Sequence, residues 1–188
     1  VLIMSLQATS STLRLWDGYW NENAIGWHLS QLNPVLKKWG EKWTSNDVKK
    51  SILFPLCGKS LDMLFFSKLG HKVAGIEGIP AAIEEFAQDN SMELKSIKSD
   101  VASFDKFSVA GEATGNNAID LYLGDFFAWP VESDKNSPKF DLVFDRGSLV
   151  AIKPTLRDQY VQRLYNMLNP GARWMIASIE YDQNSMHG

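Results

Sequence analysis

The residues that first suggest chemistry are Gly58 and Glu77, a glycine turn followed by a carboxylate. Glycine permits a tight turn whose backbone groups can approach a ligand. A carboxylate about 20 residues beyond such a turn is placed to accept hydrogen bonds from the two hydroxyls of a ribose. Taken alone, Gly58 is equally well explained as a structural turn. Glu77 has a stronger case, with a solvated acid at a strand end as its alternative. Their spacing favours the hypothesis of a nucleoside ligand.

Two later sites add polar groups of the same kind. Asp125 and Phe126 follow the strand-like run from Ala118 to Leu123 after one glycine, Gly124. A carboxylate there can accept from the exocyclic amine of an adenine while an aromatic ring packs on the base. Asp145 and Arg146 end another apolar run, and an arginine at that place can hydrogen-bond a polar heterocycle or an anion. A local ion pair between the two is the alternative.

The elements around these residues predict how they come together. Ser51 to Glu77 has the pattern of a strand, a turn, a helix and a second strand, with Gly70 ending the helix. Strands alternating with helices indicate parallel βαβ units, whose strands end at one edge of the sheet, where nucleotide-like ligands bind. We therefore predict an α/β fold with a doubly wound, mostly parallel, Rossmann-like sheet and helices on both faces.

The remaining elements follow from periodicity and turn residues. A helix is expected to start at Asn33-Pro34, with Val35, Leu36, Trp39 and Trp43 on one face. The segment Phe107 to Gly111 is predicted to pair with the strand Ala118 to Leu123 as a hairpin. Further helices are expected at Ala81 to Asn90 and Pro154 to Leu168, and further strands at Met92 to Ile97, Phe140 to Phe144 and Arg173 to Tyr181.

Length and composition bound the class of protein. The chain has 188 residues, 45% of them hydrophobic and 22% charged, which is typical of a single globular domain. A net charge of -3 makes a nucleic-acid partner unexpected. Cys57 is the one cysteine, which excludes an intramolecular disulfide and suits a reducing compartment. No membrane-length apolar run or signal peptide is recognisable, so we expect a cytoplasmic protein, with a monomer as the default.

The glycine turn narrows the ligand. Leu56-Cys57-Gly58-Lys59-Ser60 has neither the three glycines of the dinucleotide signature nor the spacing of a phosphate-binding Walker loop. A pyrophosphate ligand is therefore disfavoured, and with it a nicotinamide-dependent oxidoreductase. A turn with one glycine still presents backbone groups to an amino acid or a nucleoside.

In its order of sites the chain resembles the Rossmann-like S-adenosylmethionine-dependent methyltransferases, and more specifically the thiopurine S-methyltransferase family. The resemblance covers about Trp16 to Gly188. The segments that carry it are Trp16 to Trp20, Gly26-Trp27-His28, FPLCGKSLDM from Phe54 to Met63, GHKVAGIE from Gly70 to Glu77, FDRGSLVAIKP from Phe144 to Pro154, and SIEYDQNSMHG from Ser178 to Gly188.

The resemblance implies a function and a set of site residues. The chain would transfer a methyl group from S-adenosyl-L-methionine to the sulfur of a small aromatic or heterocyclic thiol, leaving S-adenosyl-L-homocysteine, with no metal. Residues 1–33 would form an arm or lid on a single domain, 1–188. Expected cofactor contacts are Trp16, Trp20, Leu56, Gly58, Glu77, Asp125, Phe126 and Arg146. Arg146 and Asp145 are the expected catalytic residues, and Trp27 and His28 would face the substrate.

Two departures from the family's pattern stand out, and alternatives remain open. The family usually has a residue other than aspartate at the position of Asp125. Family members also continue past the position of Gly188 with a helix and an antiparallel strand pair that this sequence does not contain. The alternatives are a related methyltransferase for halide, small thiols or selenium compounds, and a cofactor-binding protein without catalysis.

Overall fold

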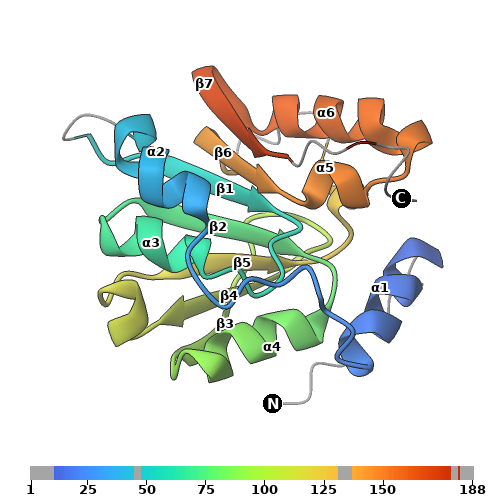
Figure 1. Ribbon diagram of the computed structural model, residues 1–188, viewed down its shortest axis with the longest axis horizontal. Helices are drawn as coiled ribbons and strands as arrows, with labels where there is room; N and C mark the ends of the chain where they lie inside the picture. Colours follow the sequence, from blue (N-terminus) through green and yellow to red (C-terminus); the bar gives the residue numbers. More distant parts are fainter. Residues whose placement is uncertain (1–10, 45–47, 131–136, 179–181, 183–188) are drawn as a thin grey trace.

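The computed structural model describes residues 11–44, 48–130, 137–178 and 182, and shows an α/β fold built on one sheet (Figure 1). Its strands are β1 (Ser51–Pro55), β2 (Lys72–Glu77), β3 (Glu93–Ile97), β4 (Asp105–Ala110), β5 (Ile119–Leu123), β6 (Phe140–Arg146) and β7 (Leu168–Ala177). Its α-helices are α1 (Ser11–Asn21), α2 (Pro34–Thr44), α3 (Asp62–Lys68), α4 (Pro80–Asp89), α5 (Ser148–Ala151) and α6 (Arg157–Asn166). Three short 3-10 helices are η1 (Glu112–Thr114), η2 (Phe126–Ala128) and η3 (Pro154–Leu156).

The sheet confirms the predicted architecture. Its seven strands lie in the order β3-β4-β5-β2-β1-β6-β7. The four pairings among β5, β2, β1, β6 and β7 are parallel. The β4–β5 hairpin forms as predicted, and β3 pairs antiparallel to β4 at the edge. The result is a mixed sheet with a parallel centre and one antiparallel end.

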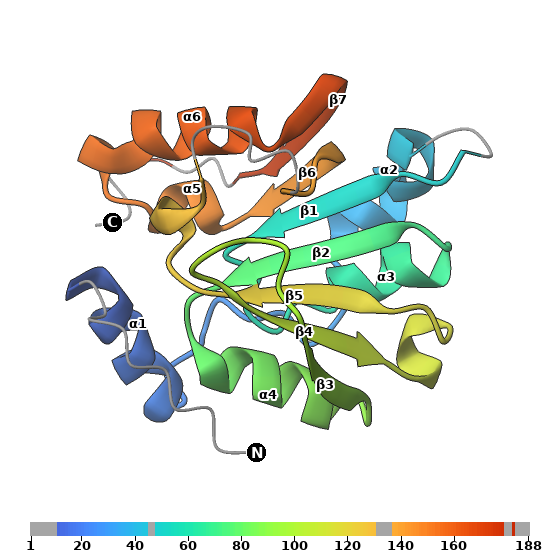
Figure 2. The same ribbon diagram turned by 180° about the vertical axis from the view of Figure 1, so that it is seen from behind.

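Side chains alternate between the two faces of the sheet, as extended backbone requires. Ile52 and Phe54 of β1 pack with buried residues of α2, α3 and α4. Leu53 points the other way and packs with Tyr160 and Leu164 of α6. The long connection between β3 and β4 crosses that second face, as Figure 2 shows. Both faces are therefore covered, which confirms the doubly wound arrangement.

Some boundaries differ from the sequence prediction. The helix expected from Pro154 to Leu168 divides into η3 and the shorter α6. Residues 169–172, which lie between the helix and the strand expected from the sequence, instead belong to β7, which runs from Leu168 to Ala177. A proline is tolerated there because β7 pairs with β6 alone among the described strands, so one side of it needs no backbone donor.

Other differences concern exposure and the chain ends. Leu36 is buried, whereas Trp39 on the same predicted face of α2 is 46% exposed. Of the segment Ser178 to Gly188, only Ser178 and Asp182 are described. The first ten residues of the expected arm 1–33 also lie outside the described residues. None of the helices that the structure describes is long and apolar enough to cross a membrane.

The parallel register brings the predicted site residues to one edge. Pro55 at the end of β1 pairs with Ile76, and Glu77 at the end of β2 pairs with Leu123. Arg146 ends β6 beside them. Helix α1 lies beyond this edge, opposite the ends of the arrows in both ribbon views (Figures 1 and 2). The arm that the sequence predicts as a lid therefore stands next to the carboxyl ends of the strands.

Candidate active site

The turn after β1 takes a backbone shape that glycine favours. Leu56 and Gly58 both have positive φ, 45° and 52°. The Cys57 amide donates to the Ile76 carbonyl at 3.0 Å, which ties the turn to β2. A Cβ on Gly58 would stand 3.4 Å from the Trp20 ring, so the indole lies directly against the turn. The predicted glycine turn is thus packed beneath a tryptophan of the arm.

Glu77 is held by backbone amides at the end of β2. Its Oε2 accepts from the Gly58 amide at 2.7 Å, and its Oε1 accepts from the Gly78 and Ile79 amides at 2.8 and 2.9 Å. The residue is 7% exposed. Burial raises the pKa of the Glu77 carboxyl above its ordinary value, although the three N–H donors act in the opposite direction. The carboxylate is fixed in place against the glycine turn.

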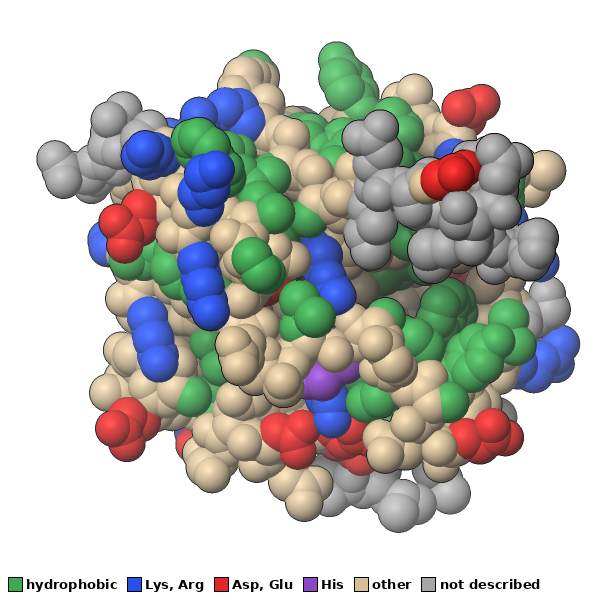
Figure 3. Space-filling model, in the orientation of Figure 1, with side chains coloured by type: hydrophobic (Ala, Val, Ile, Leu, Met, Phe, Trp, Pro, Cys, Tyr) green, Lys and Arg blue, Asp and Glu red, His purple; other side chains and the backbone are tan. Residues whose placement is uncertain are grey.

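A pocket opens over this turn and gathers six of the predicted site residues. It holds about 570 Å³ of space, counting its open mouth. The predicted residues that line it are Trp20, Trp27, His28, Leu56, Gly58 and Arg146. Trp16, Glu77, Asp125, Phe126 and Asp145 do not line it. Figure 3 shows the face of Figure 1 hollowed near its centre, with hydrophobic side chains along the rim.

The arm forms an aromatic cluster beside the pocket. Trp16, Tyr19 and Trp27 meet edge to face, with ring centroids 5.2 to 5.9 Å apart. Trp20 is buried and packs with Ile79 at the start of α4. Aromatic pairs of this kind add stability beyond the area they bury. Two of the predicted lid residues, Trp20 and Trp27, therefore reach the pocket, and Trp16 supports Trp27.

The neighbours Asp145 and Arg146 lie in different environments. Asp145 is fully buried, accepts from the Tyr160 hydroxyl at 2.8 Å and from the Leu149 amide at 3.2 Å, and does not reach the pocket. Burial raises the pKa of the Asp145 carboxyl. Arg146 lines the pocket and has no hydrogen-bond or ion-pair partner among the described residues. The alternative of an ion pair between the two does not appear there.

Asp125 and Phe126, which follow β5, also lie in different environments. Asp125 caps η2 by accepting from the Phe127 amide at 2.9 Å. Phe126 is 2% exposed and packs on Tyr160, with ring centroids 4.8 Å apart. The Phe126 ring belongs to the core in this structure, while Asp125 stays partly exposed at the sheet edge. Of these two residues, only Asp125 has a side chain that is accessible from the sheet edge.

Two charged residues of the site have roles that the sequence did not reveal. Lys59 lines the pocket and forms ion pairs with Glu85 and Asp89 of α4, at 2.7 and 2.9 Å. Asp62 is 3% exposed and accepts from the Asn33 amide at 2.8 Å, which ties the base of the arm to the start of α3. These partners lie 26 to 30 residues away in the chain, and no local pattern signals them.

The pocket has one histidine and one carboxylate among its described lining residues. Burial, with Lys59 nearby as the next contribution, lowers the pKa of His28. The carboxylate is Asp62, which is already engaged by Asn33. At neutral pH His28 is neutral and Lys59 is paired with two carboxylates, whereas Arg146 forms no ion pair among the described residues and has the Asp62 carboxylate as its charged neighbour in the lining. Arg146 can therefore offer hydrogen-bond donors and positive charge to a ligand in the pocket.

The fold and the carboxyl-edge site define a class: the S-adenosylmethionine-dependent methyltransferases of the α/β type. A solved structure with this fold is the glycopeptide N-methyltransferase MtfA complexed with S-adenosyl-L-methionine. It superposes with a TM-score of 0.54 at 14% identity, covering 79% of this chain and 56% of that one. This chain thus spans little more than half the length of that solved relative.

The chain belongs to the thiopurine S-methyltransferase family, whose profile matches residues 11–188. The thiopurine S-methyltransferase of Vibrio atlanticus (strain LGP32) is 32% identical over 173 residues, which cover 92% of this chain and 73% of that protein. That of Shewanella woodyi (strain ATCC 51908 / MS32) is 32% identical over 177 residues, with 92% and 74% covered. Membership confirms the predicted family, the methyltransferase class and S-adenosyl-L-methionine as its methyl donor.

Proposed function

We propose that this chain transfers the methyl group of S-adenosyl-L-methionine to the sulfur of a small aromatic or heterocyclic thiol. The observation that carries the proposal is Arg146, a cation with no hydrogen-bond or ion-pair partner among the described residues, in a pocket between the glycine turn and the tryptophans of the arm. A guanidinium there stabilises a thiolate or the anionic form of a thione. Bound, the donor supplies a methyl group already activated on a sulfonium.

The donor's parts match groups at the edge of the sheet. Leu56 and Gly58 line the pocket, and backbone groups of this turn suit the methionine part. Glu77 suits the ribose because each carboxylate oxygen has two acceptor positions, and Oε2 uses one of them for Gly58. Asp125, partly exposed after β5, suits the exocyclic amine of the adenine. Hydroxyl donors would also offset the burial that disfavours the ionised Glu77.

The pocket's own residues fit an acceptor that ionises easily. Asp62 is engaged with Asn33, so no free carboxylate lies among the described lining residues to act as a strong base. A heteroaromatic thiol needs none, since much of it is anionic near neutral pH. Trp20 and Trp27 align the reactants and exclude water, and an aromatic face attracts a sulfonium. We also propose that residues 1–33 act as a lid. We further propose that the protein is a monomer and that it works in the reducing cytoplasm.

The test is transfer of labelled methyl from S-adenosyl-L-methionine to three acceptors: a purine thiol, a thiophenol and iodide. The proposal expects the two aromatic thiols to accept and iodide to fail. Acceptance of iodide alone would move the chain to the halide and small-thiol methyltransferases. Binding of S-adenosyl-L-homocysteine without transfer to any acceptor would make it a cofactor-binding protein.

Arg146→Ala is the matched variant for the acceptor side. We expect it to lower turnover with a thiol far more than it lowers affinity for S-adenosyl-L-homocysteine. Equal losses in both would place Arg146 on the cofactor instead. An NADH titration monitored by tryptophan fluorescence completes the design, and saturable binding there would favour the oxidoreductase alternative.

A further inference from the structure

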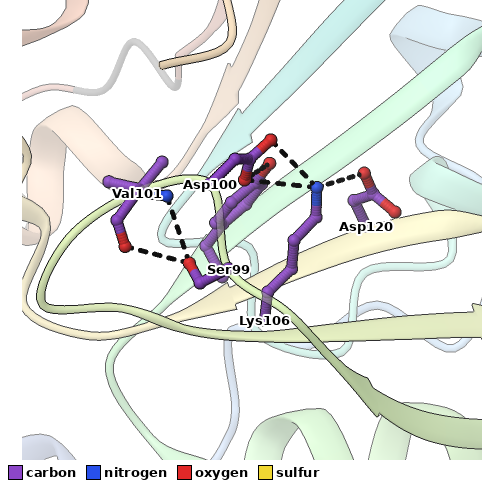
Figure 4. Close-up of polar contacts among 6 residues, drawn as sticks. Ser99, Asp100, Val101, Lys106 and Asp120 are labelled. Carbon is purple, nitrogen blue, oxygen red and sulfur yellow. Dashed lines mark hydrogen bonds and ion pairs between the residues drawn. The ribbon is translucent and has the colours of Figure 1, made fainter. Parts of the chain in front are cut away.

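A buried lysine outside the pocket joins two strands of the sheet to the connection between β3 and β4 (Figure 4). Lys106 of β4 is 8% exposed, and its Nζ lies 2.9 Å from Asp120 of β5 and 3.2 Å from Asp100. The same Nζ lies 4.8 Å from the centre of the Tyr122 ring. A buried ammonium is costly unless it is paired, and Lys106 has two carboxylates and an aromatic face. We refer to Asp100, Lys106, Asp120 and Tyr122 as the lysine cluster.

The lysine cluster fixes the connection between β3 and β4. The Tyr122 hydroxyl donates to Asp100 at 2.9 Å, so Asp100 is held by β4 and β5 together. Next to it, the Ser99 hydroxyl and Val101 bond each other through two contacts of 2.9 and 3.2 Å. This connection crosses the face of the sheet in Figure 2. Lys106 is therefore one of the contacts that hold this irregular connection, together with Tyr122 and the buried side chains of Val101 and Phe104.

The connection in turn supports the residue before Asp125. Phe104 packs against Gly124, where an added Cβ would stand 2.7 Å from the Phe104 ring. Phe104 and Tyr122 also meet Trp129 edge to face, at 5.1 and 5.2 Å. The turn that carries Asp125 thus rests on an aromatic layer of Phe104, Tyr122 and Trp129. Tyr122 of this layer contacts both Lys106 and Asp100, and Phe104 lies four residues after Asp100 in the same connection.

We propose that Lys106 is a positioning residue for recognition of the adenine, acting through the connection at Phe104 on the turn at Asp125. The proposal rests on the proposed function, because it takes Asp125 as the acceptor for the exocyclic amine. Hydrogen bonds are sensitive to small displacements, so a turn that is no longer braced loses discrimination before it loses binding. Lys106 itself does not line the pocket.

The experiment compares two compounds that differ at the edge of the base that carries the adenine amine. Affinities for S-adenosyl-L-homocysteine and S-inosyl-L-homocysteine, whose base has a carbonyl in place of the amine and a proton on the adjacent ring nitrogen, are measured by calorimetry. The ratio of the two affinities reports recognition of that edge. Variants are Lys106→Met, Lys106→Arg as the conservative rescue, and Lys95→Met as the control. Lys95 pairs with Glu93 on the same hairpin, with both side chains more than 60% exposed.

We expect the full chain to prefer the adenosyl compound by about tenfold, as one buried hydrogen bond allows. Lys106→Met should reduce that preference to about threefold or less, consistent with coupling within one network. Lys106→Arg and Lys95→Met should retain it. If Lys106→Met does not fold, Asp120→Asn removes one partner of the cation more mildly and should also lower the preference.

The outcomes separate the two proposals. A full preference in Lys106→Met, despite a lower melting temperature, would make the lysine cluster purely structural and overturn the inference. A chain with no preference in its unaltered form would remove Asp125 as the amine acceptor, and the inference would fall with it. In that second case methyl transfer to thiols would still stand, because it is tested by acceptor profiling.

Discussion

Glu77→Gln tests the ribose contact with little change in shape. The amide keeps one acceptor oxygen, which will face Gly78 and Ile79, because two amides donate on that side. Its nitrogen then faces the Gly58 amide, now 2.7 Å from Oε2, and two donors meet. One hydrogen bond to a charged acceptor contributes about 1.5–3 kcal/mol. Losing one such bond to a ribose hydroxyl predicts affinity weaker by about thirtyfold.

The assay is calorimetric titration with S-adenosyl-L-homocysteine and with its analogue that lacks both ribose hydroxyls. Removing the hydroxyls should weaken binding strongly in the unaltered chain and much less in Glu77→Gln, because the acceptor has gone. The control is Glu84→Gln, an exposed carboxylate on α4, which should leave both affinities unchanged. Urea unfolding of each variant shows whether the exchange also loosens the turn.

Two results would refute the reasoning about Glu77. One is binding of S-adenosyl-L-homocysteine to Glu77→Gln within about threefold of the unaltered chain, less than one charged hydrogen bond contributes. The other is an equal loss for the compound with and without hydroxyls, which would show that Glu77 acts only through the shape of the glycine turn. Glu77→Ala extends the series, and its loss of cofactor binding should be severe.

The other predictions concern the pH dependence that Glu77 produces and the anchoring of the arm through Asp62. Ribose donors favour the ionised form, so the pKa of Glu77 falls on binding and the complex holds fewer protons. Affinity for S-adenosyl-L-homocysteine should therefore rise with pH up to the raised pKa of the free chain and then level off, and Glu77→Gln should remove this rise in titrations at several pH values. Without ligand, the stability of the fold should depend on pH in the opposite direction. The pKa of Glu77 is higher in the folded chain than in the unfolded chain, so the stability that Glu77 contributes declines as pH rises from the unfolded pKa to the folded pKa. Urea unfolding at several pH values will show this decline. Asp62→Ala should destabilise the fold by about 1–3 kcal/mol, since the buried Asn33 amide loses its acceptor, whereas Asp62→Asn should retain most stability in the same unfolding assay. Asp62→Ala with unchanged stability would disprove the anchoring role.

Local sequence patterns predicted the frame of the site well. Gly58 and Glu77 were identifiable because a glycine turn and a strand-end acid are set by spacing within a single βαβ unit. The sequence also placed Arg146 at the end of a buried strand, and the strand's alternation then decides that Arg146 and Asp145 face opposite ways. Those features depend on local chain geometry, so one sequence is sufficient to find them.

Contacts between distant elements were not predictable in the same way. The ion pairs of Lys59 with Glu85 and Asp89 form only when the helices pack on the sheet. The same is true of the hydrogen bond from the Asn33 amide to Asp62. Phe126 and Phe127 are indistinguishable in type, and it is the packing on Tyr160 that buries Phe126. The first residues of β7, which include Pro170, were not predicted as strand because a proline signals a loop unless the strand is known to lie at an edge.

Helix α1 rests on the same three residues whose amides hold Glu77. Trp20 lies on Gly58, Leu13 lies against Gly78, and Ile79 packs with the tryptophans of the arm. Docking of the arm and ordering of the Glu77 carboxylate thus belong to one local conformational equilibrium. Thermodynamic linkage is reciprocal, so a donor that tightens the hold on Glu77 must favour the docked arm by the same factor by which the docked arm favours the donor. The protection of α1 from proteolysis at increasing donor concentrations would therefore measure the affinity for the donor.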